Sequence, residues 1–132
     1  MSGALILDSE GLAKAVQRDR SVHEWLMAAR EADMPQITSA AVLVEVIHPR
    51  IDDAALKWTL SRLRVEPVTQ AIAQSSAALL RHAGLHGHKY AIDAMLCATA
   101  LAQPGRVTIL TSDVEDIELL TADHPRVTAE KV

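Results

Sequence analysis

Aromatic side chains are nearly absent from this sequence. It contains no phenylalanine, two tryptophans and one tyrosine among 132 residues. Many proteins that bind single-stranded nucleic acid stack bases on rows of aromatic rings, so this scarcity excludes an aromatic stacking platform. The apolar fraction of 49% nevertheless suffices for a core of alanine, leucine, valine and isoleucine. We therefore expect residues 1–132 to form one folded domain.

Cysteine, excess positive charge and long apolar runs are scarce as well. Cys97 is the single cysteine, which excludes a disulfide framework, and its apolar surroundings predict a small core residue rather than a nucleophile. The net charge of −4 provides no general basic field for a polyanion, so a nucleic-acid contact would need a local patch or a metal ion. No run approaches the roughly 18 apolar residues of a membrane span. The start MSGALILD lacks the basic segment of a signal peptide. We expect a cytoplasmic protein that has no membrane contact.

Strand-like apolar runs alternate with helical patterns along the whole chain. The predicted strands are residues 4–7, 36–38, 65–68, 106–110 and 126–132. The predicted helices are residues 10–19, 21–33 (capped by Ser21), 52–63, 70–83 (capped by Thr69 and ended by Gly84), 90–103 and 114–122. Residues 39–47 fit a strand or a helix, and residues 85–89 read as a loop. This alternation predicts an α/β fold with a parallel sheet that is covered on both faces.

Five carboxylates interrupt or directly follow apolar runs. Asp8 ends ALILD, Glu45 interrupts AAVLVEVI, Asp93 lies within AIDAMLCATAL, and Asp113 and Asp116 follow VTIL. Burying an isolated charge costs several kcal/mol, so such acids indicate a shared positive partner. Ligands of parallel sheets bind beyond the carboxyl ends of strands, where Asp8 and Asp113 are expected. A site for a hard divalent cation, which prefers oxygen ligands, is the simplest prediction.

Each acid also has an ordinary structural explanation. Asp8 could only cap the first helix, and Asp113 and Asp116 could be a cap and a first-turn acid. Glu45 could point into water. Asp93 could pair with Lys89, four residues earlier on the same helix face.

The ordered set of motifs resembles PIN-domain ribonucleases, and most closely the VapC toxins of bacterial toxin–antitoxin pairs. The matching segments are LILDSEGLAKAV, the glutamate in AAVLVEVI, YAIDAMLCATAL and ILTSDVEDI, and together they extend over essentially the whole chain. The resemblance implies a three-layer α/β/α domain with a roughly five-stranded parallel sheet. It also implies an acidic site that binds Mg²⁺ or Mn²⁺ and cuts single-stranded or loop RNA.

The resemblance assigns roles to individual residues of this chain. Asp8, Glu45, Asp93 and Asp113 form the implied catalytic quartet. The implied metal ligands are Asp8, Asp93, Asp113 and Asp116. Ser9 and Thr111 stand where small hydroxyl residues assist such sites through hydrogen bonds.

The implied partners are RNA, a short antitoxin and a second copy of the chain. The RNA class (tRNA, rRNA or mRNA) stays open. Arg81 and Lys89, beside a histidine-rich segment, form a candidate patch for the RNA backbone. Trp25 is either a core anchor or part of a groove for the antitoxin. Two other functions stay open: an RNA-processing PIN nuclease without an antitoxin, and a catalytically silent PIN module that binds RNA or protein.

Overall fold

Five parallel strands form one central sheet in the order β3-β2-β1-β4-β5 in the computed structural model, which describes residues 3–132. The strands are β1 (Gly3–Leu7), β2 (Gln36–Ser39), β3 (Arg64–Glu66), β4 (Arg106–Thr111) and β5 (Val127–Lys131). β1 lies at the centre, and its Leu7 is in register with Thr38 of β2 and with Leu110 of β4. The strand order therefore reverses between β1 and β4.

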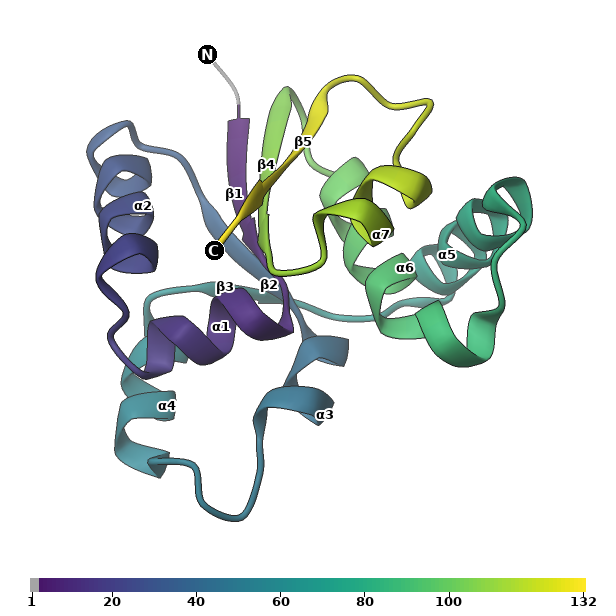
Figure 1. Ribbon diagram of the computed structural model, residues 1–132. Coiled ribbons are helices and arrows are strands. Elements are labelled where there is room, and N and C mark those ends of the chain that lie inside the picture. Colours follow the sequence, from purple (N-terminus) through teal and green to yellow (C-terminus); the bar gives the residue numbers. More distant parts are fainter. Residues whose placement is uncertain (1–2) are drawn as a thin grey trace.

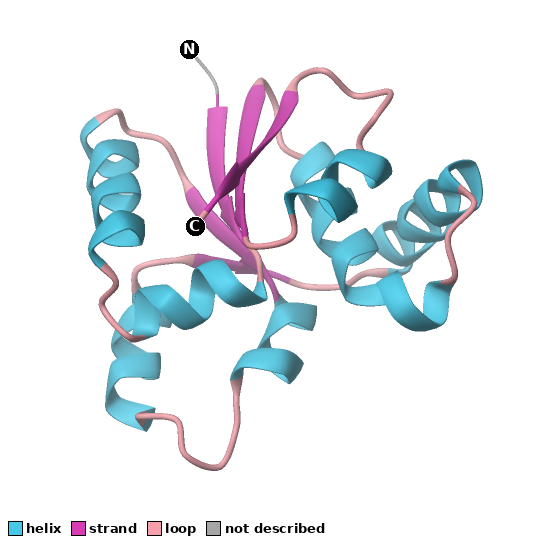
Figure 2. Cartoon of the chain, in the orientation of Figure 1, coloured by secondary structure: helices cyan, strands magenta, loops and turns pink. Residues whose placement is uncertain are grey.

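Helices cover both faces of this sheet. They are α1 (Ser9–Val16), α2 (Arg20–Glu31), the 3₁₀ turn η1 (Ala40–Val42), α3 (Leu43–Val46), α4 (Asp53–Ser61), α5 (Gln70–Ala83), α6 (Gly87–Leu101) and α7 (Val114–Leu120). Figure 1 shows α1, α2 and α4 on one side of the sheet and α5, α6 and α7 on the other. The strands lie between these two groups of helices (Figure 2). The three-layer α/β/α fold with five parallel strands is thus confirmed.

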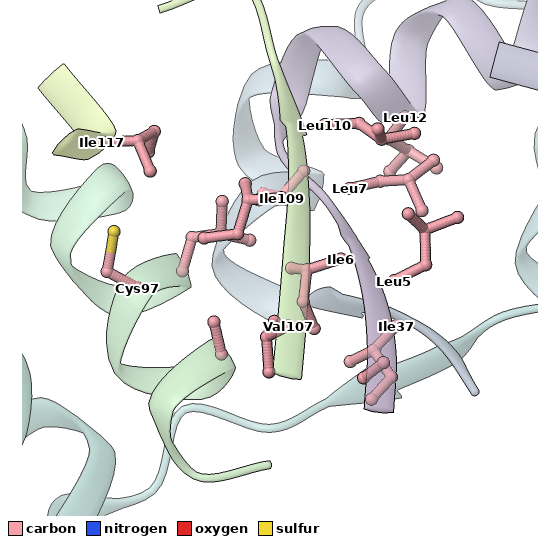
Figure 3. Packing of buried hydrophobic residues seen from close by; sticks show 14 of the residues in the cluster. Leu5, Ile6, Leu7, Leu12, Ile37, Cys97, Val107, Ile109, Leu110 and Ile117 are labelled. Carbon is pink, nitrogen blue, oxygen red and sulfur yellow. The ribbon is translucent and has the colours of Figure 1, made fainter. Parts of the chain in front are cut away.

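The core fills both faces of the sheet with aliphatic side chains. Leu5, Ile6 and Leu7 are at most 2% exposed, as expected for a central parallel strand that is buried on both sides. Figure 3 shows Leu7 beside Leu110 on one face, whereas Ile109 lies toward Cys97 on the other. The core contains no phenylalanine, so its packing depends on interlocking branched side chains.

Three boundary predictions change in the structure. The N-cap of α2 is Asp19, not Ser21, because the Asp19 carboxylate accepts a hydrogen bond from the Val22 N–H at 3.0 Å. Helix α6 begins at Gly87, inside the segment that was predicted to be a loop. Its first turn is largely exposed, so no apolar pattern marks it. The ambiguous residues 39–47 end β2 and then form η1 and α3.

The predicted first and last boundaries of α5 are confirmed. Thr69 accepts a hydrogen bond from the Ile72 N–H at 3.1 Å and caps α5. Gly84 ends the same helix with φ 67°, a left-handed conformation that glycine adopts at little cost. Within residues 3–132, no helix is long and apolar enough to cross a membrane.

Candidate metal and catalytic site

The candidate site lies where the strand order reverses. β1 and β4 are neighbours that continue to opposite edges of the sheet, and their carboxyl ends therefore leave a crevice. Asp8 follows β1 directly, and Asp113 follows β4 after one residue, Ser112. The topology thus brings together two acids that are more than a hundred residues apart in the sequence.

A cavity of ≈ 370 Å³ opens at this crevice, and its walls are rich in carboxylates. All five acids predicted from the sequence line it: Asp8, Glu45, Asp93, Asp113 and Asp116. They come from the β1–α1 junction, α3, α6, the β4–α7 junction and α7. Five separate parts of the fold therefore contribute negative charge to one small volume.

Asp8 is the most buried of these acids, with 6% of its surface exposed. Its Oδ1 accepts a hydrogen bond from the Gly11 N–H at 2.8 Å, so it caps α1 as well as facing the cavity. Burial raises the pKa of Asp8 above its usual range, and hydrogen bonds from Gly11 and Thr111 only partly oppose this effect. The capping explanation is correct for Asp8, but it accounts for only one carboxylate oxygen.

Asp113 behaves differently from an ordinary helix cap. It occupies the N-cap position of α7, yet its side chain makes no capping hydrogen bond. Instead its backbone N–H donates to Thr111 Oγ1 at 2.9 Å. The Asp113 carboxylate is therefore not engaged in capping and lines the cavity. Asp116 lines the same cavity from the first turn of α7.

Asp93 shows the electrostatic cost of the cluster most clearly. Burial is the largest effect that raises its pKa, from 3.8 to about 6. The remaining increase comes from the negative charges of Asp8, Asp116, Asp113 and Glu45. The alternative pairing with Lys89 is not observed, since no salt bridge joins these two residues in the described chain. Burial and the neighbouring carboxylates thus shift the pKa of Asp93 in the same direction.

Glu45 is oriented by Ser9. The Ser9 hydroxyl donates a hydrogen bond to Glu45 Oε1, which links the start of α1 to α3. This contact fixes the direction of an otherwise exposed carboxylate, whose second oxygen accepts no hydrogen bond from residues 3–132. Ser9 thus contacts one of the predicted acids through its hydroxyl, and Thr111 Oγ1 accepts a hydrogen bond from the backbone N–H of another, Asp113.

Two predicted RNA contacts and the predicted antitoxin contact lie in different surroundings. Lys89 lines the cavity, with its ammonium 5.1 Å from the centre of the Tyr90 ring. Arg81 is exposed in the last turn of α5 and does not line the cavity. Trp25 is half-buried on α2 and packs against the core, whereas Trp58 on α4 is 56% exposed.

Three residues of the cavity wall were not singled out as site residues. Glu10 and Ser112 each stand next to a predicted acid, and Tyr90 precedes Asp93 by three positions on α6. Residues three apart share a helix face, so Tyr90 could have been found from that spacing.

The donor chemistry suits a hard divalent cation, because the walls offer carboxylate and hydroxyl oxygens but neither cysteine nor histidine. Among residues 3–132, however, no three His, Cys, Asp or Glu side chains are already arranged to hold a metal ion. The acids share a cavity without forming a closed coordination shell. Cation binding would therefore require side-chain adjustment within this cavity.

Cys97 is excluded as an alternative reactive group. It is fully buried on α6, and burial, followed by the charges of Asp93 and Asp8, raises its thiol pKa to about 12. Because the thiolate is the nucleophilic form, this thiol is inert at neutral pH. The predicted structural role of Cys97 is confirmed.

Comparison with known proteins finds similarity at the level of structure only. No protein-family model and no curated protein sequence matches the chain. VapBC2 from Rickettsia felis, solved bound to a DNA fragment from its promoter, contains a chain with TM-score 0.68 and 16% identity. The match covers 98% of both chains.

Two further solved structures have the same architecture over nearly their full length. A toxin–antitoxin complex from Klebsiella pneumoniae matches with TM-score 0.66 and 24% identity over 98% of this chain and 100% of the other. FitAcB from Neisseria gonorrhoeae matches with TM-score 0.64 and 18% identity over 95% of each chain. The fold that the resemblance implied is confirmed: this chain has the same three-layer α/β/α architecture as chains of the VapBC2 and FitAcB structures.

Proposed function

We propose that this chain is a metal-dependent endoribonuclease, the toxin of a VapC-like toxin–antitoxin pair, acting on cytoplasmic RNA. The observation that carries the proposal is the convergence of five carboxylates on one cavity at the β1/β4 crevice. Burial, together with repulsion from the other four acids, raises the pKa of Asp93 to about 6. A fold maintains such repulsion at a cost to its stability, which is typical of functional sites.

Asp8, Asp93, Asp113 and Asp116 would hold Mg²⁺ or Mn²⁺. A bound divalent ion would supply an activated water and would neutralise charge on the scissile phosphate. Four distinct elements position these acids, so the arrangement depends on the folded sheet rather than on one flexible loop.

The protein's own groups would orient the reactants. Ser9 fixes one oxygen of Glu45, and the other oxygen would accept a proton from the attacking water. Lys89 is the one cationic side chain among the residues that line this cavity, and it would contact a phosphate oxygen of the substrate. Cys97 takes no part, which leaves hydrolysis by water rather than a covalent enzyme intermediate.

An antitoxin partner is supported by the solved structures with this fold, one of which is described as a toxin–antitoxin complex. We propose that the antitoxin contacts the α2 surface near Trp25 and that the active form is a homodimer. The exposed Trp58 extends this surface, since it lines a groove of ≈ 610 Å³ together with residues of α2. Trp58→Ala should then weaken antitoxin binding without lowering the melting temperature. Trp25→Ala, in contrast, should lower the melting temperature.

The test is cleavage of total cellular RNA by the purified chain, freed of antitoxin, in Mg²⁺ or Mn²⁺ and in EDTA. Asp93→Asn removes one charge from the cavity, and Asp53→Asn is the matched control, because Asp53 is exposed on α4 and does not line the cavity. We expect discrete cuts that need metal, persist in Asp53→Asn and vanish in Asp93→Asn. RNA that stays intact with folded wild-type protein would favour a silent RNA- or protein-binding module instead. Cleavage by a chain that has no antitoxin partner in its source cell would favour an RNA-processing nuclease.

A further inference from the structure

We propose that one flank of the RNA strand leaves the acidic cavity through the groove between α1 and the loop before α4, where Arg18 and Arg50 bind its phosphates. This inference rests on the proposed nuclease function and adds the path of its substrate. A cleaved strand must continue beyond the scissile phosphate on at least one side. The charges of the adjoining surfaces therefore decide which way a polyanion can run.

The groove is continuous with the cavity. It has a volume of ≈ 570 Å³ and shares three wall residues with the cavity: Ser9, Glu10 and Glu45. Beyond these shared residues its charged and ionisable lining consists of Arg18, His48, Arg50 and one acid, Asp52. A strand that enters the cavity would therefore pass from the acids directly to cationic side chains.

The hollow on the other side of the cavity has the opposite character. It shares Ser112, Asp113 and Asp116 with the cavity, and it adds Glu115 and Glu118. Lys131 is the one cation among its lining residues. A phosphate chain would be repelled there, which favours the Arg18–Arg50 groove as its exit.

The two guanidinium groups of the groove are available for a ligand. Neither Arg18 nor Arg50 makes a salt bridge or a side-chain hydrogen bond within residues 3–132. Among the other arginines, Arg30, Arg81 and Arg106 also lack such partners within residues 3–132, but none of them lines the groove. Two further arginines are committed to the fold. Arg64 binds Glu66 and Gln103, and Arg126 donates to backbone carbonyls after α6. Unpaired guanidinium groups that line one groove provide the fork of donors that phosphates accept.

Neighbouring groups leave this end of the groove open to an anion. The carboxylate of Asp52, the nearest acid in the sequence to Arg50, is engaged as the cap of α4, where its Oδ1 accepts from the Ala55 N–H at 3.0 Å. The Arg50 N–H donates to His48 Nδ1 at 3.2 Å. The neutral His48 ring then carries its hydrogen on Nε2, which is a further donor for a phosphate oxygen.

Arg18 adopts a backbone conformation that is unusual for an arginine and that it shares with Asp33. The Asp19 N–H donates to the Lys14 carbonyl at 2.9 Å and the Arg18 N–H to the Ala15 carbonyl at 3.1 Å, which is the pattern of a Schellman motif. Arg18 occupies the left-handed position of this motif, with φ 61°. Glycine or asparagine is the favourable choice there. An arginine at this position accepts backbone strain and places a cation in the groove.

The test compares two double variants that remove the same charge. Arg18→Asn with Arg50→Gln removes the groove cations, and asparagine tolerates the left-handed backbone. Arg30→Gln with Lys131→Gln is the control, since neither residue lines the groove and both are exposed. The probe is a fluorescein-labelled, mixed-sequence single-stranded RNA of about 12 nucleotides. Its binding is measured by fluorescence anisotropy in EDTA, at salt concentrations between about 0.05 and 0.2 M.

We expect the groove variant to bind this RNA on the order of tenfold more weakly at about 0.1 M salt, with the salt slope reduced by about 1.4 for two lost phosphate contacts. The control should stay within about twofold of the wild type, and the charge-reversed single variant Arg50→Glu should weaken binding further. Equal losses in both double variants, or unchanged binding in the groove variant, would overturn the proposal. Unchanged RNA binding combined with antitoxin binding lost in Arg50→Glu would assign the groove to a protein partner, because Arg50, unlike Arg18, does not also line the groove at Trp58.

Failure of this inference differs from failure of the nuclease proposal. If wild-type protein cuts RNA and the groove variant cuts it with unchanged KM, the strand leaves by another path. If wild-type protein cuts no RNA, the nuclease proposal fails, while the anisotropy comparison still shows whether this groove binds a polyanion.

Discussion

At the scale of single residues, the acids of the cavity work against the stability of the fold. Asp93 combines burial with repulsion from the other four carboxylates, which raises its pKa to about 6. The pKa of Asp8 is raised for the same main reason, the burial of its side chain. In the unfolded chain these groups regain ordinary pKa values near 3.8. The folded protein therefore binds more protons than the unfolded chain between these two pKa values.

The first prediction concerns stability without metal. A raised acid pKa means that stability is fully present below the unfolded value and decreases as pH rises from about 4 to about 6. Asp93→Asn should remove this penalty and stabilise the protein by about 1 kcal/mol at neutral pH, a figure reduced for the partial exposure of the group. Thermal melts in EDTA at several pH values measure it. An equal effect of the substitution at pH 4 and pH 8 would contradict the assigned cause.

A second prediction concerns Cys97. Since its thiol is buried and its pKa is raised to about 12, it should not react with a thiol-specific disulfide reagent in the native protein at neutral pH. The reaction should become fast in denaturant, when the thiol returns to a value near 9.0. Rapid stoichiometric reaction of the native protein would show that α6 packs less closely against the sheet than the structure has it.

At the scale of elements, the position of Asp8 depends on how closely α1 approaches β4. A Cβ atom at Gly11 would lie 2.9 Å from the Leu110 carbonyl oxygen, a distance too short for a side chain. Gly11 also donates its N–H to Asp8 at 2.8 Å. The close approach of the helix and the orientation of the carboxylate therefore depend on the same glycine.

The third prediction follows from this contact. Gly11→Ala should push α1 away from β4 and destabilise the protein by about 1–3 kcal/mol, the range for overpacked cores. It should also weaken divalent-cation binding, because Asp8 would lose its fixed direction. Gly87→Ala is the matched control, because its added Cβ would have only an ordinary contact with Leu80 at 3.7 Å. Urea unfolding of both variants measures the difference, and equal stability would contradict the account.

The elements also show where sequence reasoning succeeds and where it stops. β1, β4 and the caps of α5 follow from local patterns, so the sequence predicted them correctly. Asp8 and Asp113 could be placed together because parallel strands share one carboxyl edge. Glu45 and Asp93 lie on helices, and no local pattern says that these helices reach the same edge. Their grouping with the first two acids rested on their apolar surroundings, which suggested a shared cation, and on the family resemblance.

Two other segments differ from the local sequence pattern, each for its own physical reason. Residues 39–47 contain β-branched side chains that favour a strand locally, yet the chain turns into η1 and α3 and carries Glu45 to the cavity. Tertiary packing decides such segments. The start of α6 at Gly87 was hidden because its first turn faces solvent.

At the scale of the whole molecule, charge is distributed unevenly around one crevice. The chain carries a net charge of −4, and its acids concentrate in the cavity and in the hollow beside α7. The groove on the other side offers Arg18, His48 and Arg50. A polyanionic substrate could therefore dock on one side only, once the acidic cavity itself is neutralised. This makes cation binding the central step of the account.

Titration with Mn²⁺, followed by electron paramagnetic resonance of the free ion, tests that step most directly and requires no knowledge of the RNA target. The account predicts that the wild-type chain binds Mn²⁺, that its melting temperature rises on binding, and that Asp93→Asn lowers the affinity by at least about tenfold. Asp53→Asn should bind like the wild type. Equal Mn²⁺ affinity in the wild type and in Asp93→Asn, or no binding by the folded wild type, would contradict the claim that these carboxylates form a metal site.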